Sequence, residues 1–146
     1  MIALLDVNVL IALAWPSHVH NDAAHRWFAK NGSNGWATCP MTQSGFVRVS
    51  GQPAAVKTLI PMHSAMTLLE ANLKSSHHHF WAQDCDITLM QPEIKTRVLG
   101  PRQLSDAILL DLAIRNGGVL ATFDSRIQQL LPAGSPLLKH IEVIAV

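Results

Sequence analysis

The N-terminal stretch MIALLDVNVLIALAW, residues 1–15, decides the fold class and raises the first question about function. Thirteen of its residues are apolar, and only Asp6 and Asn8 interrupt them. An ionised carboxylate buried without partners is so unfavourable that it takes up a proton, pairs with a cation or binds a metal. Asp6 is therefore expected to be either the N-cap of a helix that follows a buried strand or a functional carboxylate.

Composition limits the classes of protein to which the chain can belong. Its 146 residues predict one domain, residues 1–146, with a sizeable core. Only 14% of the residues are charged, so an apolar face for a partner protein is expected. The net charge of +1 gives no global field that would attract nucleic acid, so any polyanion site must be local.

Neither a membrane span nor a signal peptide fits the N-terminal stretch. No basic residues precede it, and no uninterrupted apolar run approaches the roughly 18 residues that a bilayer requires. Cys39 and Cys85 lack metal-ligand spacing and are expected to be buried thiols in a reducing compartment, the cytoplasm. The histidines at 18–25 and 77–79 lack the second ligand pair that would predict zinc.

Short apolar runs alternate with helical patterns along the chain. The runs predict strands at 2–5, 36–39, 87–90, 119–123 and 141–146, and the patterns predict helices at 21–30, 42–49, 64–75 and 103–116. Such alternation predicts an α/β fold with a mainly parallel sheet of about five strands, flanked by helices.

Three aspartates are expected to face inward. Asp6 and Asp124 each follow a predicted strand, at the sheet edge where parallel sheets bind ligands. In the helix at 103–116, helical spacing places Asp106 on the apolar face and Asp111 outward, in a solvated ion pair with Arg115. The alternative for Asp106 is a first-turn acid behind an N-cap at Ser105, complementing the helix dipole.

Gln43 lies on the same side of a predicted helix as Phe46 and Val47. Its amide is therefore a further candidate for the site, or else it makes a hydrogen bond at the edge of the core. Three carboxylates at one edge would repel each other, and a divalent cation removes this conflict. Because the donors are all oxygens, Mg²⁺ or Mn²⁺ is expected, and either ion suits phosphodiester hydrolysis.

The segments LLDVNVLIAL, CPMTQSGFVRV, QLSDAILLDLAIRNGG and LATFDSRI, in this order, resemble the PIN domain, and specifically the VapC-like ribonuclease toxins of type II toxin–antitoxin systems. The resemblance implies a three-layer α/β/α sandwich that is usually dimeric. It also implies an enzyme that cuts RNA with Mg²⁺ or Mn²⁺, and a cognate antitoxin protein as partner.

The resemblance also implies roles for individual residues. Asp6, Asp106 and Asp124 would bind the metal, Asn8 would orient Asp6 or a metal-bound water, and Thr122 would support Asp124. The family's usual second acid, a Glu, falls on Gln43, which favours a single metal and modest activity. Three arginines close to these positions are candidates for contacting RNA phosphates, or else are ordinary surface charges: Arg48, Arg102 and Arg126.

Two other functions remain open at this point. A haloacid-dehalogenase-like phosphatase would use Asp6 as a nucleophile, but that class has a second Asp where this chain has Asn8. A PIN domain with Gln43 in place of an acid could instead bind RNA or its antitoxin without cutting. Dependence on a divalent metal separates this binding module from a nuclease.

Overall fold

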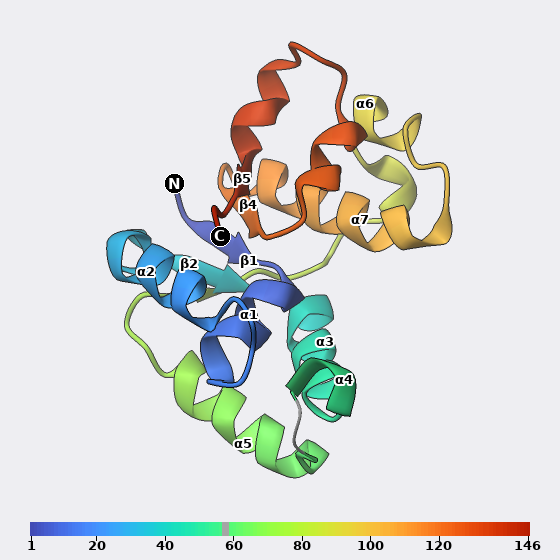
Figure 1. Ribbon diagram of the computed structural model, residues 1–146. Helices are drawn as coiled ribbons and strands as arrows, with labels where there is room; N and C mark the ends of the chain where they lie inside the picture. Colours follow the sequence, from blue (N-terminus) through green and yellow to red (C-terminus); the bar gives the residue numbers. More distant parts are fainter. Residues whose placement is uncertain (57–58) are drawn as a thin grey trace.

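The computed structural model describes residues 1–56 and 59–146, and it is an α/β/α sandwich (Figure 1). Five short strands form its sheet: β1 (Ala3–Leu5), β2 (Trp36–Thr38), β3 (His78–Phe80), β4 (Val119–Thr122) and β5 (Ile141–Val143). The α-helices are α1 (Val7–Ala14), α2 (Asn21–Asn31), α3 (Pro40–Ser50), α4 (Pro53–Val56), α5 (Met62–Leu73), α6 (Pro92–Lys95) and α7 (Pro101–Arg115). The 3₁₀ helices are η1 (Gly32–Asn34), η2 (Ile87–Leu89), η3 (Ser125–Leu130) and η4 (Pro136–His140).

The strands lie in the order β3-β2-β1-β4-β5, and every pair is parallel. The chain builds the sheet outward from β1, first through β2 to β3 and then, on the other side, through β4 to β5. The direction of winding thus reverses between β1 and β4. The crevice beyond the carboxyl ends of two such strands is where open α/β sheets bind ligands.

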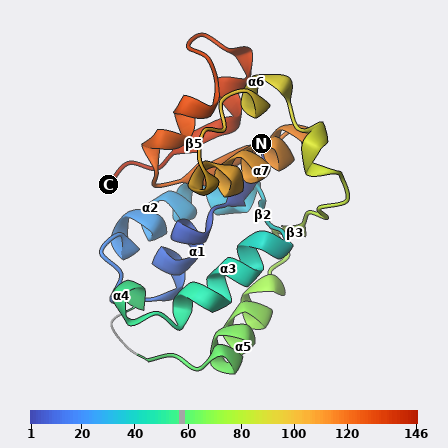
Figure 2. The ribbon, with the colours of Figure 1, turned by 90° about the vertical axis from the view of Figure 1, so that its right-hand side faces the viewer.

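Each face of the sheet is buried under its own helices (Figures 1 and 2). Leu4 and Leu120 belong to a core shared with α6 and α7. Leu5 and Ala121, one residue further along each strand, belong to a second core shared with α1, α2, α3 and α5. Adjacent residues of a strand point to opposite faces, so strands covered on both faces are apolar throughout.

The close packing of α1 against α3 depends on Gly45. A Cβ atom at this position would collide with the side chain of Val7 in α1. Because Asp6 caps α1 and Gln43 lies in the first half of α3, this packing holds both at the same end of the sheet.

Four of the five predicted strands and all four predicted helices are confirmed, within a few residues at their ends. The strand predicted at 87–90 is wrong. Residues 87–89 form η2 instead, because the Asp86 carboxylate accepts hydrogen bonds from the backbone and hydroxyl of Thr88 and closes a turn. The remaining strand is β3, an edge strand with mostly exposed side chains.

Two predictions about single residues are also wrong. Cys85 is exposed rather than buried, whereas Cys39 is buried as expected, and both thiols are free. Asp111 does pair with Arg115, at 2.7 Å, but it is only 8% exposed and not solvated. Its other oxygen accepts the backbone N–H of Gln91 at 2.9 Å, so α7 carries Asp111 against the segment that leads into α6.

No helix within residues 1–56 and 59–146 combines the length and the apolar character that crossing a membrane demands.

Candidate active site

Asp6 lies where β1 ends and α1 begins, and it is both an N-cap and a half-buried acid. Its Oδ1 accepts the backbone N–H of Val7 at 2.7 Å, which caps the helix. Its Oδ2 accepts the hydroxyl of Thr122 at 2.6 Å. Burial raises the pKa of Asp6, and the charge of Asp124 adds to this, whereas the hydrogen bonds from Thr122 and Val7 lower it.

Asn8 and Thr122 tie the ends of β1 and β4 together. The amide nitrogen of Asn8 donates to Oδ2 of Asp6 at 3.2 Å and to the Thr122 hydroxyl at 3.1 Å. The amide oxygen of Asn8 accepts the backbone N–H of Phe123 at 3.2 Å. Thr122, which is fully buried, also accepts the backbone N–H of Asp124 at 3.1 Å. This network fixes the orientation of Asp6.

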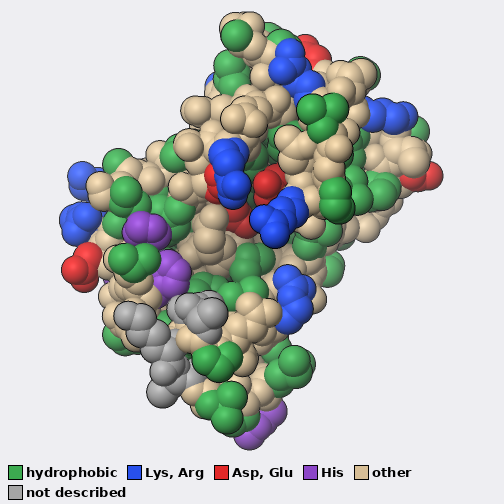
Figure 3. All heavy atoms as spheres, turned by 45° about the vertical axis from the view of Figure 1, so that its right-hand side comes forward, with side chains coloured by type: hydrophobic (Ala, Val, Ile, Leu, Met, Phe, Trp, Pro, Cys, Tyr) green, Lys and Arg blue, Asp and Glu red, His purple; other side chains and the backbone are tan. Residues whose placement is uncertain are grey.

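Asp124 is the N-cap of η3 and is held by Arg126. The guanidinium Nε lies 2.9 Å from Oδ1, and Nη2 lies 2.7 Å from Oδ2, a two-pronged arrangement. The Arg126 side chain thereby lowers the pKa of Asp124. Basic side chains next to acidic ones are visible in a hollow near the centre of the face in Figure 3.

Asp106 reaches this cluster from α7 and is half-buried. Burial, followed by the negative charges of Asp6 and Asp124, raises the pKa of Asp106 to about 6, and Arg126 opposes this shift. The three carboxylates therefore interact, although 118 positions separate Asp6 from Asp124 in the sequence. The alternative reading of Asp106 as a first-turn acid is wrong, because α7 begins at Pro101 with Gly100 as its N-cap.

Gln43 approaches from α3, and its amide nitrogen donates to the hydroxyl of Thr38 at 3.0 Å. Thr38 ends β2, the neighbour of β1 on the side away from β4. The hydrogen bond expected at the edge of the core therefore exists.

The arginines predicted as RNA contacts are all exposed. Arg48 lies in the last turn of α3 and Arg102 in the first turn of α7. Arg126 is bound to Asp124, a contact that the sequence pattern does not predict. The i, i+2 spacing of these two residues was visible in the sequence, but it does not by itself distinguish an ion pair from two independent charges.

The donor set fits Mg²⁺ or Mn²⁺ in its chemistry. It consists of oxygens, and burial together with the neighbouring carboxylates raises the pKa of Asp6 and of Asp106, so a cation would stabilise their charged forms. Within the described part of the chain, however, no three His, Cys, Asp or Glu side chains are already grouped closely enough to hold a metal ion.

Comparison with known proteins identifies the family. The family model of the PIN domain matches residues 3–130. The chain therefore belongs to the PIN domain family, which excludes the haloacid-dehalogenase-like phosphatase.

Among its relatives, Ribonuclease VapC39 of Mycobacterium tuberculosis is 42% identical over 134 residues, which is 92% of this chain and 96% of that protein. Ribonuclease VapC38 of the same species is 45% identical over 123 residues, 84% of this chain and 85% of that protein. The crystal structure of VapBC2 from Rickettsia felis, bound to a DNA fragment from their promoter, contains a chain with the same fold. Its TM-score is 0.64 at 16% identity, covering 99% of this chain and 100% of that one.

Proposed function

We propose that this protein is a metal-dependent endoribonuclease, the toxin of a type II toxin–antitoxin pair, which hydrolyses RNA phosphodiester bonds with Mg²⁺ or Mn²⁺. The observation that carries the proposal is the convergence of three acids: Thr122 bonds to the carboxylate of Asp6 and to the backbone of Asp124, and both charges act on the pKa of Asp106. Membership of the PIN domain family and the likeness to VapC ribonucleases support it.

Asp6, Asp106 and Asp124 are the proposed metal ligands. A divalent ion bound there would supply a water of lowered pKa as nucleophile and would stabilise the charge that develops on the phosphate. The guanidinium of Arg126 bonds to both oxygens of Asp124 and would compete with the ion for them.

Three neutral side chains complete the proposed catalytic set. Thr122 and Asn8 hold Oδ2 of Asp6, so its Oδ1 and remaining lone pairs keep a fixed direction. Gln43 contributes an amide oxygen instead of a carboxylate. With one negative charge fewer than the family pattern, we expect a one-metal site of modest activity.

Arg48, Arg102 and Arg126 are proposed to contact RNA phosphates beside this site. All three are exposed, so each is accessible to a polyanion. Arg126 would exchange its carboxylate partner for a phosphate when metal and RNA are present, because guanidinium groups bind either anion in the same two-pronged way.

The proposed partner protein is a cognate antitoxin, and the proposed assembly of the toxin itself is a homodimer. An apolar cavity of about 260 Å³, lined among others by Leu10, Phe28 and Leu69, opens between the helices on the α1 face. An antitoxin segment that fills it would cover part of the apolar surface expected from the composition. A toxin of this kind would act on cellular RNA in the cytoplasm.

The test is RNA cleavage by antitoxin-free protein with Mn²⁺, run beside Asp6→Asn and Asp106→Asn. Both substitutions preserve side-chain shape while removing a charge, so cleavage should be lost in each and in excess chelator. Cleavage that survives both substitutions would come from a contaminant and would count against the proposal.

A non-cutting role, binding RNA or the antitoxin, is the second candidate because Gln43 replaces an acid. Such a module would bind RNA equally well in chelator and would show no cleavage with any divalent ion. Gln43→Glu separates the two functions: restoring the charge should increase Mn²⁺ affinity and turnover if Gln43 belongs to the site.

A further inference from the structure

A chain of hydrogen bonds runs behind Gln43, away from the aspartates. The amide nitrogen of Gln43 donates to the Thr38 hydroxyl at 3.0 Å, and this hydroxyl lies 2.7 Å from Nε2 of His78. Thr38 is fully buried at the end of β2, and His78 begins the neighbouring strand β3. The three side chains thus connect α3, β2 and the edge of the sheet.

The contacts of His78, at the end of this chain far from Gln43, decide which atom donates in each hydrogen bond. His78 also interacts with the backbone of Leu73, and this contact raises the pKa of His78, as a carbonyl acceptor does. Since Nε2 faces Thr38, we assign the contact with the Leu73 carbonyl to Nδ1. A carbonyl oxygen can only accept, so Nδ1 carries the proton.

The surroundings of His78 favour its neutral ring. Burial and the neighbouring His79 lower its pKa by more than the contact with Leu73 raises it. The ring also lies against Trp36, with centroids 4.7 Å apart, and the two residues are paired in the β2–β3 register. A neutral ring with its proton on Nδ1 has a bare Nε2, which can only accept.

The Thr38 hydroxyl must therefore give its single proton to His78. It can then only accept from Gln43, and only the amide nitrogen of Gln43 can donate. The amide nitrogen of Gln43 is therefore on the Thr38 side, in agreement with its 3.0 Å hydrogen bond to that hydroxyl. The amide oxygen of Gln43 is consequently the atom on the side away from Thr38.

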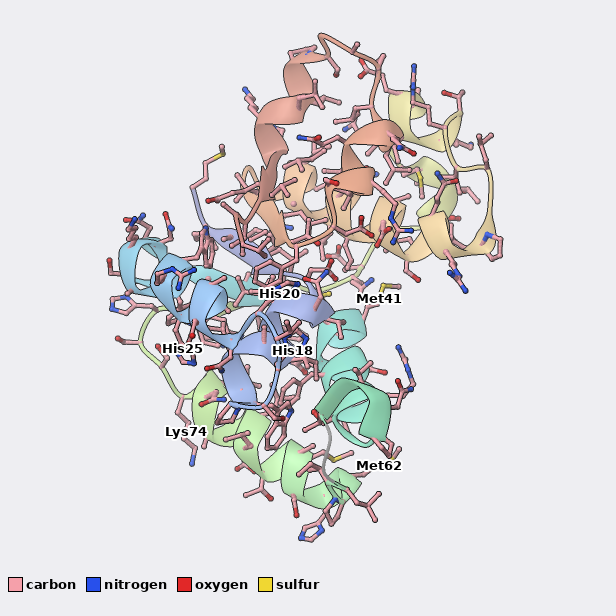
Figure 4. The ribbon with its side chains drawn as sticks, viewed as in Figure 1. His18, His20, His25, Met41, Met62 and Lys74 are labelled. Atoms are coloured by element: carbon pink, nitrogen blue, oxygen red, sulfur yellow. The ribbon has the colours of Figure 1, made fainter. Side chains whose placement is uncertain are left out.

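We propose that Thr38 and His78 are positioning residues that hold Gln43 with its amide oxygen presented to the acidic edge, as a neutral ligand for the metal or for a metal-bound water. Figure 4 shows Met41, two residues before Gln43, at the end of α3 that meets the sheet. This inference rests on the proposed function, because it assigns a role within that site.

The same chain explains why glutamine suits this position. A carboxylate at position 43 has no proton to donate, so Thr38 would have to serve two acceptors, that carboxylate and Nε2 of His78, with one proton. The ring of His78 would then need a second proton, on Nε2, in order to keep its hydrogen bond with Thr38. Gln43, Thr38 and His78 are therefore a matched set.

The first test is the tautomer of His78, read from ring ¹⁵N chemical shifts of metal-free protein. Its signals are identified by their absence in His78→Phe, and His77→Gln, which changes an exposed neighbour, is the control. We expect the proton on Nδ1 in the wild type and a second ring proton in Gln43→Glu at the same neutral pH. A wild-type ring with its proton on Nε2 would overturn the inference.

The second test is a double-mutant cycle on Mn²⁺ affinity. Thr38→Val should weaken Mn²⁺ binding by about tenfold in the wild type, the usual effect of removing support behind a ligand. It should have no further effect in Gln43→Ala, and Thr38→Ser should restore binding. An equal loss in both backgrounds would mean a merely structural role. If Thr38→Val fails to fold, His78→Phe replaces it in the cycle with the same expectation.

The two proposals fail in different ways. If the wild type binds Mn²⁺ but cleaves no RNA, the proposed nuclease function is wrong, while the tautomer and the cycle still decide the role of Thr38 and His78. If the wild type cleaves RNA but the cycle shows no coupling between Thr38 and Gln43, only the positioning role is wrong.

Discussion

The Thr122 hydroxyl donates a 2.6 Å hydrogen bond to Oδ2 of Asp6, joining the carboxyl ends of two adjacent parallel strands. It is the shortest of the bonds that orient Asp6, and Thr122 is fully buried. This bond lowers the pKa of Asp6 against the effect of burial. Thr122 therefore helps to keep Asp6 in the charged form that a metal requires.

Removing this donor should impair the site while preserving the fold. Thr122→Val has the same shape as threonine but cannot donate, so the pKa of Asp6 should rise and Mn²⁺ affinity should fall by about tenfold at pH 7. Calorimetric titration with Mn²⁺ measures this change. Thr122→Ser keeps the hydroxyl and should bind nearly as the wild type does. Equal affinities for the valine and serine variants would contradict the role given to Thr122.

Asp106 should make the metal-free protein less stable as the pH rises. Its folded pKa of about 6 lies above the ordinary value of 3.8, so the folded state holds the proton more tightly. The resulting stability is complete below pH 3.8 and is lost as the pH rises through about 6. Because the side chain is half-exposed, solvent screening reduces the effect to about 1 kcal/mol.

Unfolding by urea between pH 4.5 and 7.5, in chelator, measures this dependence. Asp106→Asn should lack the slope and should be more stable than the wild type at pH 7.5. The difference between the two proteins cancels the titration of the histidines, which both share. A difference that does not change with pH would show that Asp106 does not titrate in this range.

Arg126 should compete with the metal for Asp124. In Arg126→Gln both oxygens of Asp124 lose their guanidinium partner. If the removal of this competitor favours binding of the ion by about 1.4 kcal/mol, the affinity for Mn²⁺ should rise on the order of tenfold. RNA should bind more weakly if Arg126 also contacts phosphate. Electron paramagnetic resonance of free Mn²⁺ measures the first effect. Arg26→Gln, which changes an exposed arginine on α2, is the control, and weaker Mn²⁺ binding in Arg126→Gln alone would contradict the competition.

Asp111 should matter for stability rather than for catalysis. Asp111→Ala leaves the backbone N–H of Gln91 without its acceptor and removes the partner of Arg115, so the free energy of unfolding should fall by about 2 kcal/mol. Thermal unfolding measures this loss. Asp22→Ala, which changes an exposed acid on α2, should leave stability nearly unchanged. Loss of Mn²⁺ binding in well-folded Asp111→Ala would show that Asp111 belongs to the site.

The sequence was sufficient to predict the elements that bury apolar side chains. Strands β1 and β4 are covered on both faces, so each is a continuous apolar run that ends near an acid. The edge strand β3 was missed because an edge strand needs few buried side chains, and the run HHF shows no apolar pattern. Residues 87–90 are as apolar as the buried strands, but Asp86 closes a local turn there, so they do not form a strand.

The same limit applies to the candidate site. Helical spacing correctly predicts that Asp106 faces inward, but it wrongly predicts that Asp111 faces solvent. Asp111 is buried because α6 and the segment before it fold back over α7, which is a tertiary contact. The pairing of Arg126 with Asp124 and the chain from Gln43 through Thr38 to His78 likewise depend on side-chain geometry that residue spacing does not encode.

The central claim is that Asp6, Asp106 and Asp124 together bind one divalent ion, and a Mn²⁺ titration of the purified protein followed by calorimetry tests it most directly. The account predicts one ion per chain, with binding lost in Asp6→Asn and strongly weakened in Asp106→Asn and Asp124→Asn. Binding of Mn²⁺ with unchanged affinity in all three variants, or no binding by the wild type at millimolar Mn²⁺, would contradict it.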